Sequence, residues 1–449
     1  MMVPSHNNII PKSFLLVAFV LLFTGLSFGL IGALQYVMPG ILKDGFSFQK
    51  VRPLHVSSVV FWIIFGAIGT VLTYLQEHGT AKNYSHSLLK LQFVIFVITV
   101  AAILISYLTG NFGGREYWEF PPYLAIPLIA GWLLFLINFI RSVSSFKNQP
   151  VYFWMWLTGI FFFLFTFLES YLWIFPFFAE NIIKDMTIQW KSYGSMVGSW
   201  NMLIYGSGIF LMDKISGSKD YSKSKMAFGL YFLGLFNLMF NWGHHIYTLP
   251  TAAFVKYISY AVSMTELFIF GKIIYDWKSS ITTAQKYFNR QSYMFMVAAD
   301  AWVFLTLSLA ICMSVPAINL YTHGTHITVA HTMGATIGIN SMLLFAFASD
   351  ILTAPSSKFI RIWFWIINIS LFVFWISLII AGVYKSIWQM SAVQQPFGNM
   401  MRGLHPFFVI FFISGIVLAT GLVAVSVLMI KRSFVRATAS RNDLIANVQ

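Results

Sequence analysis

The sequence predicts an all-α integral membrane protein, a single bundle of twelve transmembrane helices. Of its 449 residues, 58% are hydrophobic and only 9% are charged, which is far too little polar surface for a soluble domain. Apolar runs long enough to cross a bilayer recur along almost the whole chain. Because no polar stretch remains for a second, soluble domain, residues 1–449 are expected to form one membrane domain.

Each predicted span is an apolar run bounded by polar, basic or Gly/Pro breaks. The first run is too long for the apolar region of a signal peptide and lacks a basic leader with a small-residue cleavage site, so it should remain as a helix. In chain order the spans are roughly 13–36, 54–76, 88–109, 121–141, 151–175, 187–212, 225–247, 251–275, 290–313, 324–352, 360–384 and 404–430.

The distribution of basic residues predicts the orientation. With the N-terminus in the cytoplasm, 19 of the 28 Lys and Arg residues fall in inside segments and the other nine fall outside. This asymmetry places both termini in the cytoplasm, in a prokaryotic cytoplasmic (inner) membrane that the chain crosses many times. The net charge of +14 is spread over short loops, so it reflects topology and gives no reason to expect a nucleic-acid partner.

The single cysteine, Cys312, restricts the cofactor chemistry. One thiol cannot form a disulfide framework, a thiolate zinc site, an iron–sulfur cluster or the paired attachment site of c-type heme. Any heme in this chain is therefore held non-covalently, and a heme c electron donor has to be a separate protein.

Histidines are the main chemical signal, because an ionisable side chain within a span is costly and marks a functional site by default. Seven of the ten histidines fall at the outer ends of predicted spans. They come from four separate helices that deliver imidazoles to one membrane depth, which isolated core hydrogen bonds would not require. The seven are His55, His244, His245, His323, His326, His331 and His405.

Three of these positions suggest metal or heme ligation. His55 lies about one turn inside its span, where a neutral imidazole can ligate heme iron. His244 and His245 point about 100° apart on a regular helix, so both reach one metal only if the helix end is irregular. His331 and Met333 face nearly opposite sides of one helix, which could then ligate two hemes. The alternatives are interfacial histidines bonded to water or headgroups and a methionine that only packs.

Five motifs carry a resemblance to a known family. They are Arg52-Pro53-Leu54-His55, Gly114-Arg115-Glu116-Tyr117, Gly243-His244-His245, Glu266, and Tyr321-Thr322-His323-Gly324-Thr325 leading to His331. With these motifs the chain resembles the catalytic subunit of the heme–copper oxidase superfamily. Within that superfamily it is most similar to the cytochrome c-dependent nitric oxide reductases, followed by the cbb-type oxygen reductases.

The resemblance implies two b-type hemes and a non-heme metal. It implies that His55 and Met333 hold a low-spin heme, that His331 is the proximal ligand of a high-spin heme, and that His244 and His245 bind the metal facing it. Further implied roles are proximity to heme propionates for His323 and Arg115, a position near a bridging calcium for Glu116, and proton donation for Glu266. A neutral carboxylic acid bonded to a neighbour is the alternative for Glu266.

The sequence departs from the family at the metal centre. The family's sixth helix supplies a third histidine ligand, but an ungapped count from His244 places Tyr193 there, with Val197 and Asn201 at two family glutamate positions. Two imidazoles alone form a weak site, so Tyr193 as a phenolate, Asn201 or water would complete it, and iron is favoured over copper. Met333 replaces a heme-ligating histidine, and His/Met ligation raises the heme reduction potential.

These observations favour a divergent nitric oxide reductase-like subunit in the membrane lipid. It would take electrons from a membrane-anchored cytochrome c subunit or a soluble cytochrome c and act on NO in preference to O2, with dismutation of NO as a variant. A terminal oxygen reductase of the cbb type and a non-catalytic heme subunit or gas sensor without the second metal are the alternatives. A secondary transporter is disfavoured, because no internal repeat is visible.

Overall fold

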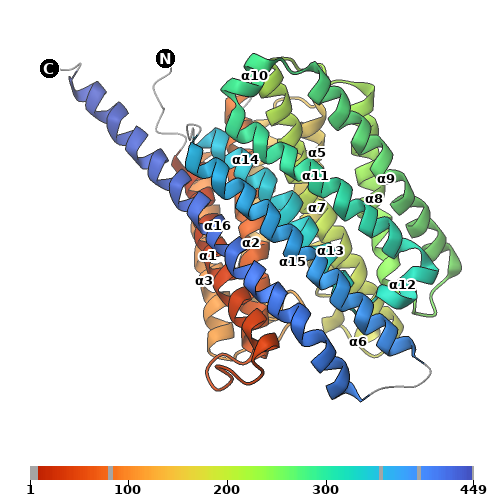
Figure 1. Ribbon diagram of the computed structural model, residues 1–449. Coiled ribbons are helices and arrows are strands. Elements are labelled where there is room, and N and C mark those ends of the chain that lie inside the picture. The colour runs from red at the N-terminus through yellow and green to blue at the C-terminus, as the bar shows by residue number, and fades with distance from the viewer. Residues whose placement is uncertain (1–8, 79–83, 353–356, 392–395, 447–449) are drawn as a thin grey trace.

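The computed structural model describes residues 9–78, 84–352, 357–391 and 396–446 (Figure 1). At 266–270, 272–273, 276, 280, 284 and 433–446 it describes the backbone alone. Within this part of the chain the structure is helical, and the one β-type contact described is an isolated bridge between Arg115 and Trp118.

The helices run antiparallel to their chain neighbours in a tilted bundle (Figure 1). In chain order they are α1 (Ile9–Val37), α2 (Phe48–Glu77), α3 (His86–Leu108), η2 (Pro122–Leu124), α4 (Ala125–Ser142), α5 (Val151–Glu169), η3 (Leu172–Ile174), α6 (Pro176–Ala179), α7 (Ile182–Ser216), α8 (Lys225–Phe240), η4 (Asn241–Ile246), α9 (Ala253–Ser280), α10 (Thr283–Phe288), α11 (Arg290–Ser314), α12 (Pro316–Thr322), α13 (His326–Met333), η5 (Gly334–Ser341), α14 (Met342–Ile351), α15 (Lys358–Met390) and α16 (Phe397–Ala446).

Ten helical segments of the described chain are long and apolar enough to cross a membrane. They confirm an all-α, multi-pass membrane architecture, but not the predicted count of twelve spans. The two remaining predicted spans, 187–212 and 251–275, do lie in helices, α7 of 35 residues and α9 of 28 residues. Neither helix has a sufficiently apolar window, because α7 is rich in Gly and Ser and both α7 and α9 carry several charged residues.

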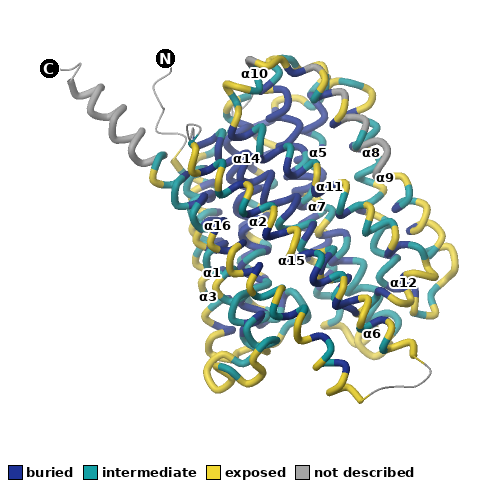
Figure 2. The backbone as a smooth tube through the Cα atoms, viewed as in Figure 1, coloured by how far each residue is buried: buried dark blue, intermediate teal, exposed yellow. Residues whose placement is uncertain are grey.

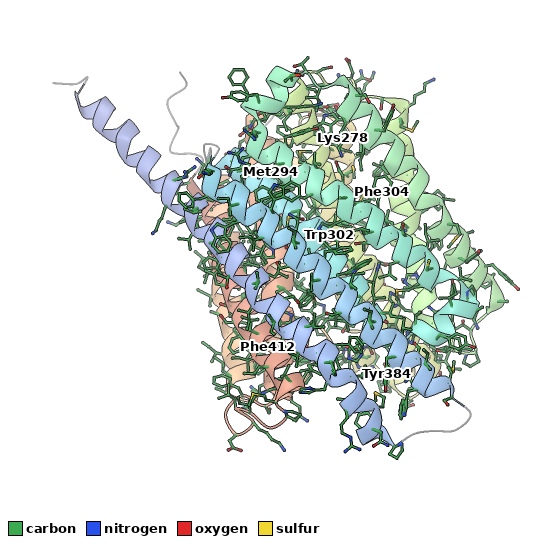
Figure 3. All side chains as sticks on the ribbon, viewed as in Figure 1. Lys278, Met294, Trp302, Phe304, Tyr384 and Phe412 are labelled. Atoms are coloured by element: carbon green, nitrogen blue, oxygen red, sulfur yellow. The ribbon has the colours of Figure 1, made fainter. Side chains whose placement is uncertain are left out.

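The most buried of these helices are α14, α2 and α5, and α7 packs between α5, α8 and α2 (Figure 2). Of the apolar window of α2, 89% is buried, against 33% for α3 at the periphery. A helix surrounded by protein needs no apolar surface for lipid, which explains why the polar α7 can occupy the centre. Figure 3 shows the side chains that fill the spaces between the helices.

The beginning of α1 and the end of α16 lie at the same end of the bundle, at the top of Figure 1. We call this the inner end, because the positive-inside distribution predicts that it faces the cytoplasm. The opposite end, which carries α6 and α12, is called the outer end.

The tenth predicted span is not one regular helix. It consists of α13, the π-helical turn η5 and α14, and η5 begins directly after Met333. Two glycines let neighbouring side chains touch its backbone: a Cβ on Gly334 would lie 2.5 Å from Thr306 Oγ1, and one on Gly338 would lie 2.5 Å from Trp302 Cγ. π-Helical turns are frequent at functional sites. Because a π-helical turn holds more residues than an α-helical turn, the side chains after Met333 are rotated about the helix axis relative to those of His331 and Met333.

Candidate functional site

His55 is held by α1 in the orientation of an iron ligand. Its Nδ1 lies 2.7 Å from the backbone oxygen of Gly25, which can only accept a hydrogen bond. Nδ1 therefore carries the proton, and the lone pair resides on Nε2. Gly29 provides room for the ring, because a Cβ there would lie 2.7 Å from Nδ1.

His244 is oriented in the same manner by a neighbouring amide. Its Nδ1 lies 3.0 Å from Oδ1 of Asn241. That oxygen also accepts from Ser263, and the Asn241 amide nitrogen donates to Asn237 at 3.2 Å, so the oxygen is the atom that faces His244. Nδ1–H donation leaves Nε2 free, as in metal-ligating histidines whose second nitrogen is bonded to a fixed acceptor. The Asn319 side chain donates to the His244 carbonyl at 3.2 Å and anchors η4 to α12.

The irregular helix end expected for the adjacent pair is present, because both histidines lie in the 3₁₀ turn η4. Their ring centroids are 4.2 Å apart, so the two imidazoles converge. His244 and His245 also lie within electrostatic range of His323 and His331. Thus η4, the α12–α13 junction and α13 bring four of the predicted site histidines together at the outer end.

Trp190 is a site residue that the sequence analysis missed. Its indole stacks on His245 with ring centroids 4.8 Å apart and planes 11° apart, and it meets His323 edge-on at 6.3 Å. Stacking restricts the plane of the His245 ring. In the sequence, Trp190 lies about one turn before Tyr193 and Gly194 on α7. Aromatic residues of a hydrophobic core have the same spacing, so spacing alone does not identify Trp190 as a site residue.

The face of α7 that meets α8 and η4 carries two glycines, Gly194 and Gly198. A Cβ on Gly194 would lie 2.7 Å from Trp242 Cβ, and a Cβ on Gly198 would lie 2.9 Å from Leu238 Cβ. The backbone of α7 therefore packs directly on α8 and η4. Asn201, one turn further, accepts a hydrogen bond from Asn340 of η5 at 3.1 Å.

Tyr193 lies beside this glycine face. Its ring packs against Tyr117 of the α3–α4 loop, with centroids 5.4 Å apart and planes at 85°. Its electrostatic neighbours are Glu119, Glu116, Arg115 and Tyr117. Tyr193 therefore borders the acidic loop, and its ligation of a metal at His244 and His245 stays a prediction.

His331 is surrounded by polar atoms that lack partners. Thr306 Oγ1 and Trp375 Nε1, which lie against the neighbouring Gly334, are buried without a partner, and the His331 ring faces the backbone of Thr306. Met333 is partly buried and packs on the main core. Buried polar atoms are rarely left unpaired in a folded protein, so these orphans mark a place where a further group belongs.

The four ligand candidates His55, His244, His245 and His331 are enclosed by the bundle but only partly covered by protein atoms. Space therefore borders each imidazole, as needed for side chains that receive a prosthetic group. Together with the Nε2 lone pairs of His55 and His244, this space fits the binding of heme iron and of a metal ion.

The predicted propionate and calcium residues form ion pairs at the outer end. Arg115 pairs with Asp185 of α7, and its guanidinium lies 4.9 Å from the centroid of the Trp173 ring. Glu116 pairs with Arg52, which also contacts Glu119 at 2.8 Å.

Burial governs the protonation of the groups around this loop. It raises the pKa of Glu119, although the Arg52 charge opposes the shift. It raises the pKa of Tyr117 to about 12, and Glu116 adds to the effect. Burial also lowers the pKa of His323, which is neutral at pH 7. The α3–α4 loop and its neighbours therefore combine ion-paired groups with buried groups whose neutral form is favoured.

Other predicted residues lie away from this cluster or cannot be placed. His326 packs against Phe408 of α16, with ring centroids 5.2 Å apart, and His405 bonds to the Val37 carbonyl at 3.1 Å. The side chain of Glu266 lies outside the described residues, although its backbone belongs to α9. Among the residues whose positions are described, no three His, Cys, Asp or Glu side chains form a metal-binding group.

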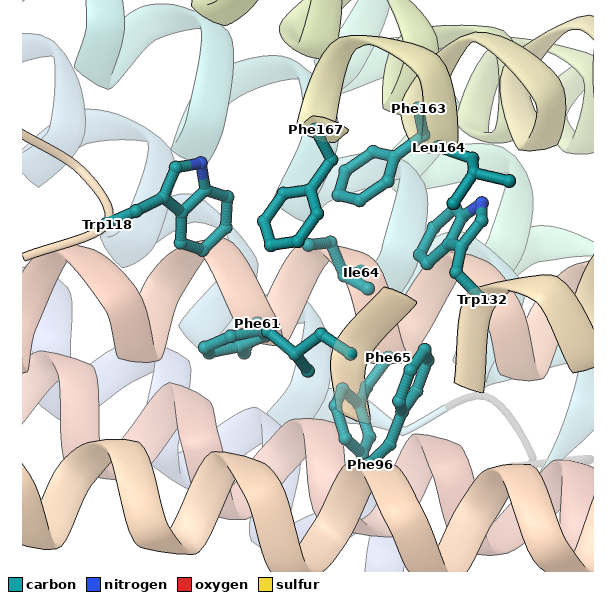
Figure 4. Close-up of a pocket in the computed structure, with 10 residues that line it drawn as sticks. Phe61, Ile64, Phe65, Phe96, Trp118, Trp132, Phe163, Leu164 and Phe167 are labelled. Atoms are coloured by element: carbon teal, nitrogen blue, oxygen red, sulfur yellow. The ribbon is translucent and has the colours of Figure 1, made fainter. Parts of the chain in front are cut away.

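Figure 4 shows an apolar cavity among α2, α3, α4, α5 and the α3–α4 loop. Its free space is about 20 Å³, enough for one small molecule. None of the predicted ligands lines it, so it is separate from the histidine cluster. The lining residues are Phe61, Ile64, Phe65, Phe96, Trp118, Leu128, Trp132, Phe163, Leu164 and Phe167.

This membrane bundle places histidines with an available ring nitrogen at its outer end. That arrangement is typical of membrane proteins that bind heme and metal ions. The chain matches the family model "Cytochrome C and Quinol oxidase polypeptide I" over residues 9–417 and belongs to that family, the heme–copper oxidase subunit I proteins. It is therefore an oxidoreductase of the heme–copper oxidase superfamily and an integral multi-pass membrane protein.

Individual relatives agree with this family. The chain is 23% identical to a nitric oxide reductase subunit of Stutzerimonas stutzeri, with 93% of each chain covered. It is 19% identical to the Cbb3-type cytochrome c oxidase subunit CcoN1 of the same species, with 94% of each covered. A solved heme–copper terminal oxidase dimer superposes with a TM-score of 0.71 at 14% identity, covering 96% of this chain and 84% of that one, and it supports the fold.

Proposed function

We propose that this protein is a nitric oxide reductase-like respiratory subunit that passes electrons from a cytochrome c partner through a low-spin heme to a high-spin heme and a non-heme metal. The observation that carries the proposal is the geometry of η4. His244 has Nε2 free for a metal, and its ring converges with His245 near His331 of a different helix.

In this proposal the hemes are b-type, and the single cysteine excludes the paired thiols that attach c-type heme. When bound, they supply one-electron transfer and a site for a diatomic gas. His55 and Met333 hold the low-spin heme, and His331 holds the high-spin heme. His323 and Arg115 lie toward the propionates, where donors stabilise carboxylate charge.

For the second metal we propose iron, with His244 and His245 as ligands and Tyr193 as the candidate third ligand. Imidazole and phenolate suit iron better than a copper site that normally has three imidazoles. Tyr193 packs on Tyr117 beside the acidic loop, so this role would require its side chain to turn toward η4. Calcium at Glu116 requires further ligands from a partner, because Arg52 already pairs with this carboxylate.

The proposed substrate is NO. Two NO molecules, two electrons and two protons give N2O and water, and Glu266 is the proposed proton donor. The relative that shares 23% identity over 93% of both chains is a nitric oxide reductase subunit, which supports NO over O2. The cytochrome c oxidase relatives keep oxygen reduction as the second candidate.

A non-catalytic heme subunit is the third candidate, because the described residues hold no group of three or more metal-binding His, Cys, Asp or Glu side chains. Heme and metal stoichiometry of the purified protein separates these candidates. We expect two b-type hemes and one additional iron per chain, together with NO consumption driven by reduced cytochrome c. Two hemes without a further metal would overturn the binuclear centre and favour the non-catalytic subunit.

Tyr193→Phe tests the third ligand directly. The phenylalanine ring keeps the packing on Tyr117 but cannot bind iron, so bound non-heme iron should fall while both hemes remain. Elemental analysis beside the pyridine hemochrome spectrum gives the ratio. Stoichiometric iron in this variant would remove Tyr193 from the ligand set.

A further inference from the structure

The inner ends of α11 and α15 carry cations where helices normally carry anions. The N-terminus of a helix has a positive dipole and unpaired N–H groups, so acidic residues or capping side chains stabilise it. Neither helix has an acidic residue in its first turn, and the N-cap residues Asn289 and Ser357 make no side-chain capping hydrogen bond. Arg290 instead begins α11, and Arg361 lies in the first turns of α15.

These two arginines face one small pocket. It is lined by Arg290, Gln291, Met294, Ser357, Ile360 and Arg361, so it joins both helix N-termini. Within the described residues neither arginine forms a salt bridge, whereas every ion pair described at the outer end neutralises its cation. Two helix dipoles and two guanidinium groups therefore converge on one place without a negative charge.

Gln291 supplies an independent indication of a ligand. The residue is 6% exposed, and its Oε1 is buried without a partner. Its Nε2 donates to Ser349 Oγ at 3.1 Å, while that hydroxyl donates to the Phe345 carbonyl at 2.7 Å, so the amide cannot be reversed. The pocket therefore offers one hydrogen-bond acceptor at its base beside cations at its rim. Its free space of about 10 Å³ fits one group the size of a water molecule.

We propose that the two arginines of this pocket bind the phosphate of a membrane phospholipid, while the water-sized space between the helices admits only the terminal hydroxyl or ammonium of the headgroup. The phosphate pairs with Arg290 and Arg361 at the two helix N-termini, and a hydroxyl or ammonium of the headgroup donates to Gln291 Oε1. Basic pockets between transmembrane helices at the cytoplasmic side suit such anions. The acyl chains lie along α15, where Phe359, Ile362, Trp365 and Ile369 are 46–68% exposed.

The lipid identity follows from this pairing of charges and acceptor. Phosphatidylglycerol and phosphatidylethanolamine carry both a phosphate and a donor, whereas phosphatidylcholine has the phosphate but no donor. Diacylglycerol has no phosphate, and inorganic phosphate has no acyl chain. The site therefore discriminates among these probes. It lies at the opposite end of the bundle from the histidine cluster and does not rest on the proposed function.

Native mass spectrometry of the delipidated full-length protein, titrated with each probe, tests the proposal. We expect phosphatidylglycerol to bind most tightly, phosphatidylcholine more weakly, and diacylglycerol and inorganic phosphate not to compete. The double variant Arg290→Gln/Arg361→Gln should lose phosphatidylglycerol affinity about tenfold or more, since both phosphate contacts are removed. Arg141→Gln/Lys147→Gln removes the same charge from exposed inner positions after α4 and should bind as the wild type does.

Gln291→Leu removes the acceptor without changing charge, so it should bind the two zwitterionic lipids, phosphatidylethanolamine and phosphatidylcholine, equally, whereas the wild type should prefer phosphatidylethanolamine. This variant also carries the test if the arginine variant fails to fold. Unchanged phosphatidylglycerol binding in the arginine variant, or equal losses in the control pair, would overturn the site. Displacement of the lipid by inorganic phosphate would overturn the lipid as its occupant.

Discussion

The two ends of the bundle use ionisable side chains in opposite ways. At the outer end, imidazoles converge beside space that protein atoms do not fill, and their second nitrogens are fixed by backbone or amide oxygens. At the inner end, outside the Arg290 and Arg361 pocket, charges from three helices neutralise one another: Lys214 of α7 contacts Glu77 of α2 and Asp350 of α14, both at 2.8 Å. The histidines at the outer end therefore suit the binding of a cofactor. The ion pairs of Lys214 at the inner end hold helices together.

This difference follows from what each group needs. A metal-binding imidazole must be neutral and must keep one lone pair unpaired, so its surroundings cannot satisfy it completely. A charged side chain among helices is costly unless it is paired, so the most stable arrangement satisfies it completely. Substitutions at the two ends should therefore affect different properties, cofactor content at the outer end and stability at the inner end.

His331→Ala should produce the largest effect at the outer end. It removes the only candidate proximal ligand on α13, so the high-spin heme should be lost while the low-spin heme at His55 remains, and about half of the heme is lost. Optical spectra and pyridine hemochrome content measure this. His405→Ala is the matched control, because His405 lies at the outer end of α16 and bonds to a backbone carbonyl. An unchanged high-spin spectrum in His331→Ala would break the assignment.

Lys214→Met should produce the largest effect at the inner end. It leaves Glu77 and Asp350 side by side without a cation, and we expect a loss of about 1–2 kcal/mol because the lysine is partly exposed. Thermal unfolding should occur at a lower temperature with heme content unchanged. Lys90→Met, at an exposed inner position on α3, should unfold as the wild type does. Heme loss without destabilisation would contradict the division between the two ends.

Trp190→Leu should sharpen the outer-end assignment. Loss of the stacked indole frees the His245 ring, and metal affinity should fall about threefold to tenfold, the equivalent of one aromatic contact. Trp190→Phe keeps a stacking ring and should restore most of the affinity. Metal titration of the depleted protein measures both, and the electronic spectrum of the metal reports a change in ligand orientation. Equal affinity in Trp190→Leu would show that the stack does not position His245.

The smallest expected effect is the pH dependence contributed by His78 at the inner end. Burial, with the nearby Lys219 and Lys223 charges, lowers the pKa of His78 to about 4 from its usual 6.5. The folded state therefore binds fewer protons than the unfolded state between these values, so its stability contribution is complete above pH 6.5 and declines as the pH falls toward 4. His78→Gln should unfold with a weaker acid dependence. A stronger dependence in the variant would reverse the sign.

Much of the architecture could be predicted because it depends on local patterns. Apolar length determined where helices form, and the positions of His55, His244, His245, His323 and His331 in their spans indicated one depth. The count of spans could not be predicted with the same rule, because α7 is surrounded by protein and therefore tolerates a polar sequence. An irregular turn at His244 and His245 is what the sequence requires if both rings bind one metal, since a regular helix would separate the two rings.

Other features depended on contacts between distant segments. The sequence by itself determined an all-helical membrane bundle with one cysteine, imidazoles at the outer ends of four spans and no histidine on α7, because these follow from composition and helical periodicity. Only the tertiary structure decided that Gly25 and Asn241 orient His55 and His244, that Trp190 stacks on His245, and that Tyr193 faces the acidic loop. The contacts of Gly25, Trp190 and Tyr193 join helices far apart in the chain, and their packing depends on side-chain volumes that periodicity does not describe. The Asn241 contact is local, but it exists only because η4 leaves the regular helix.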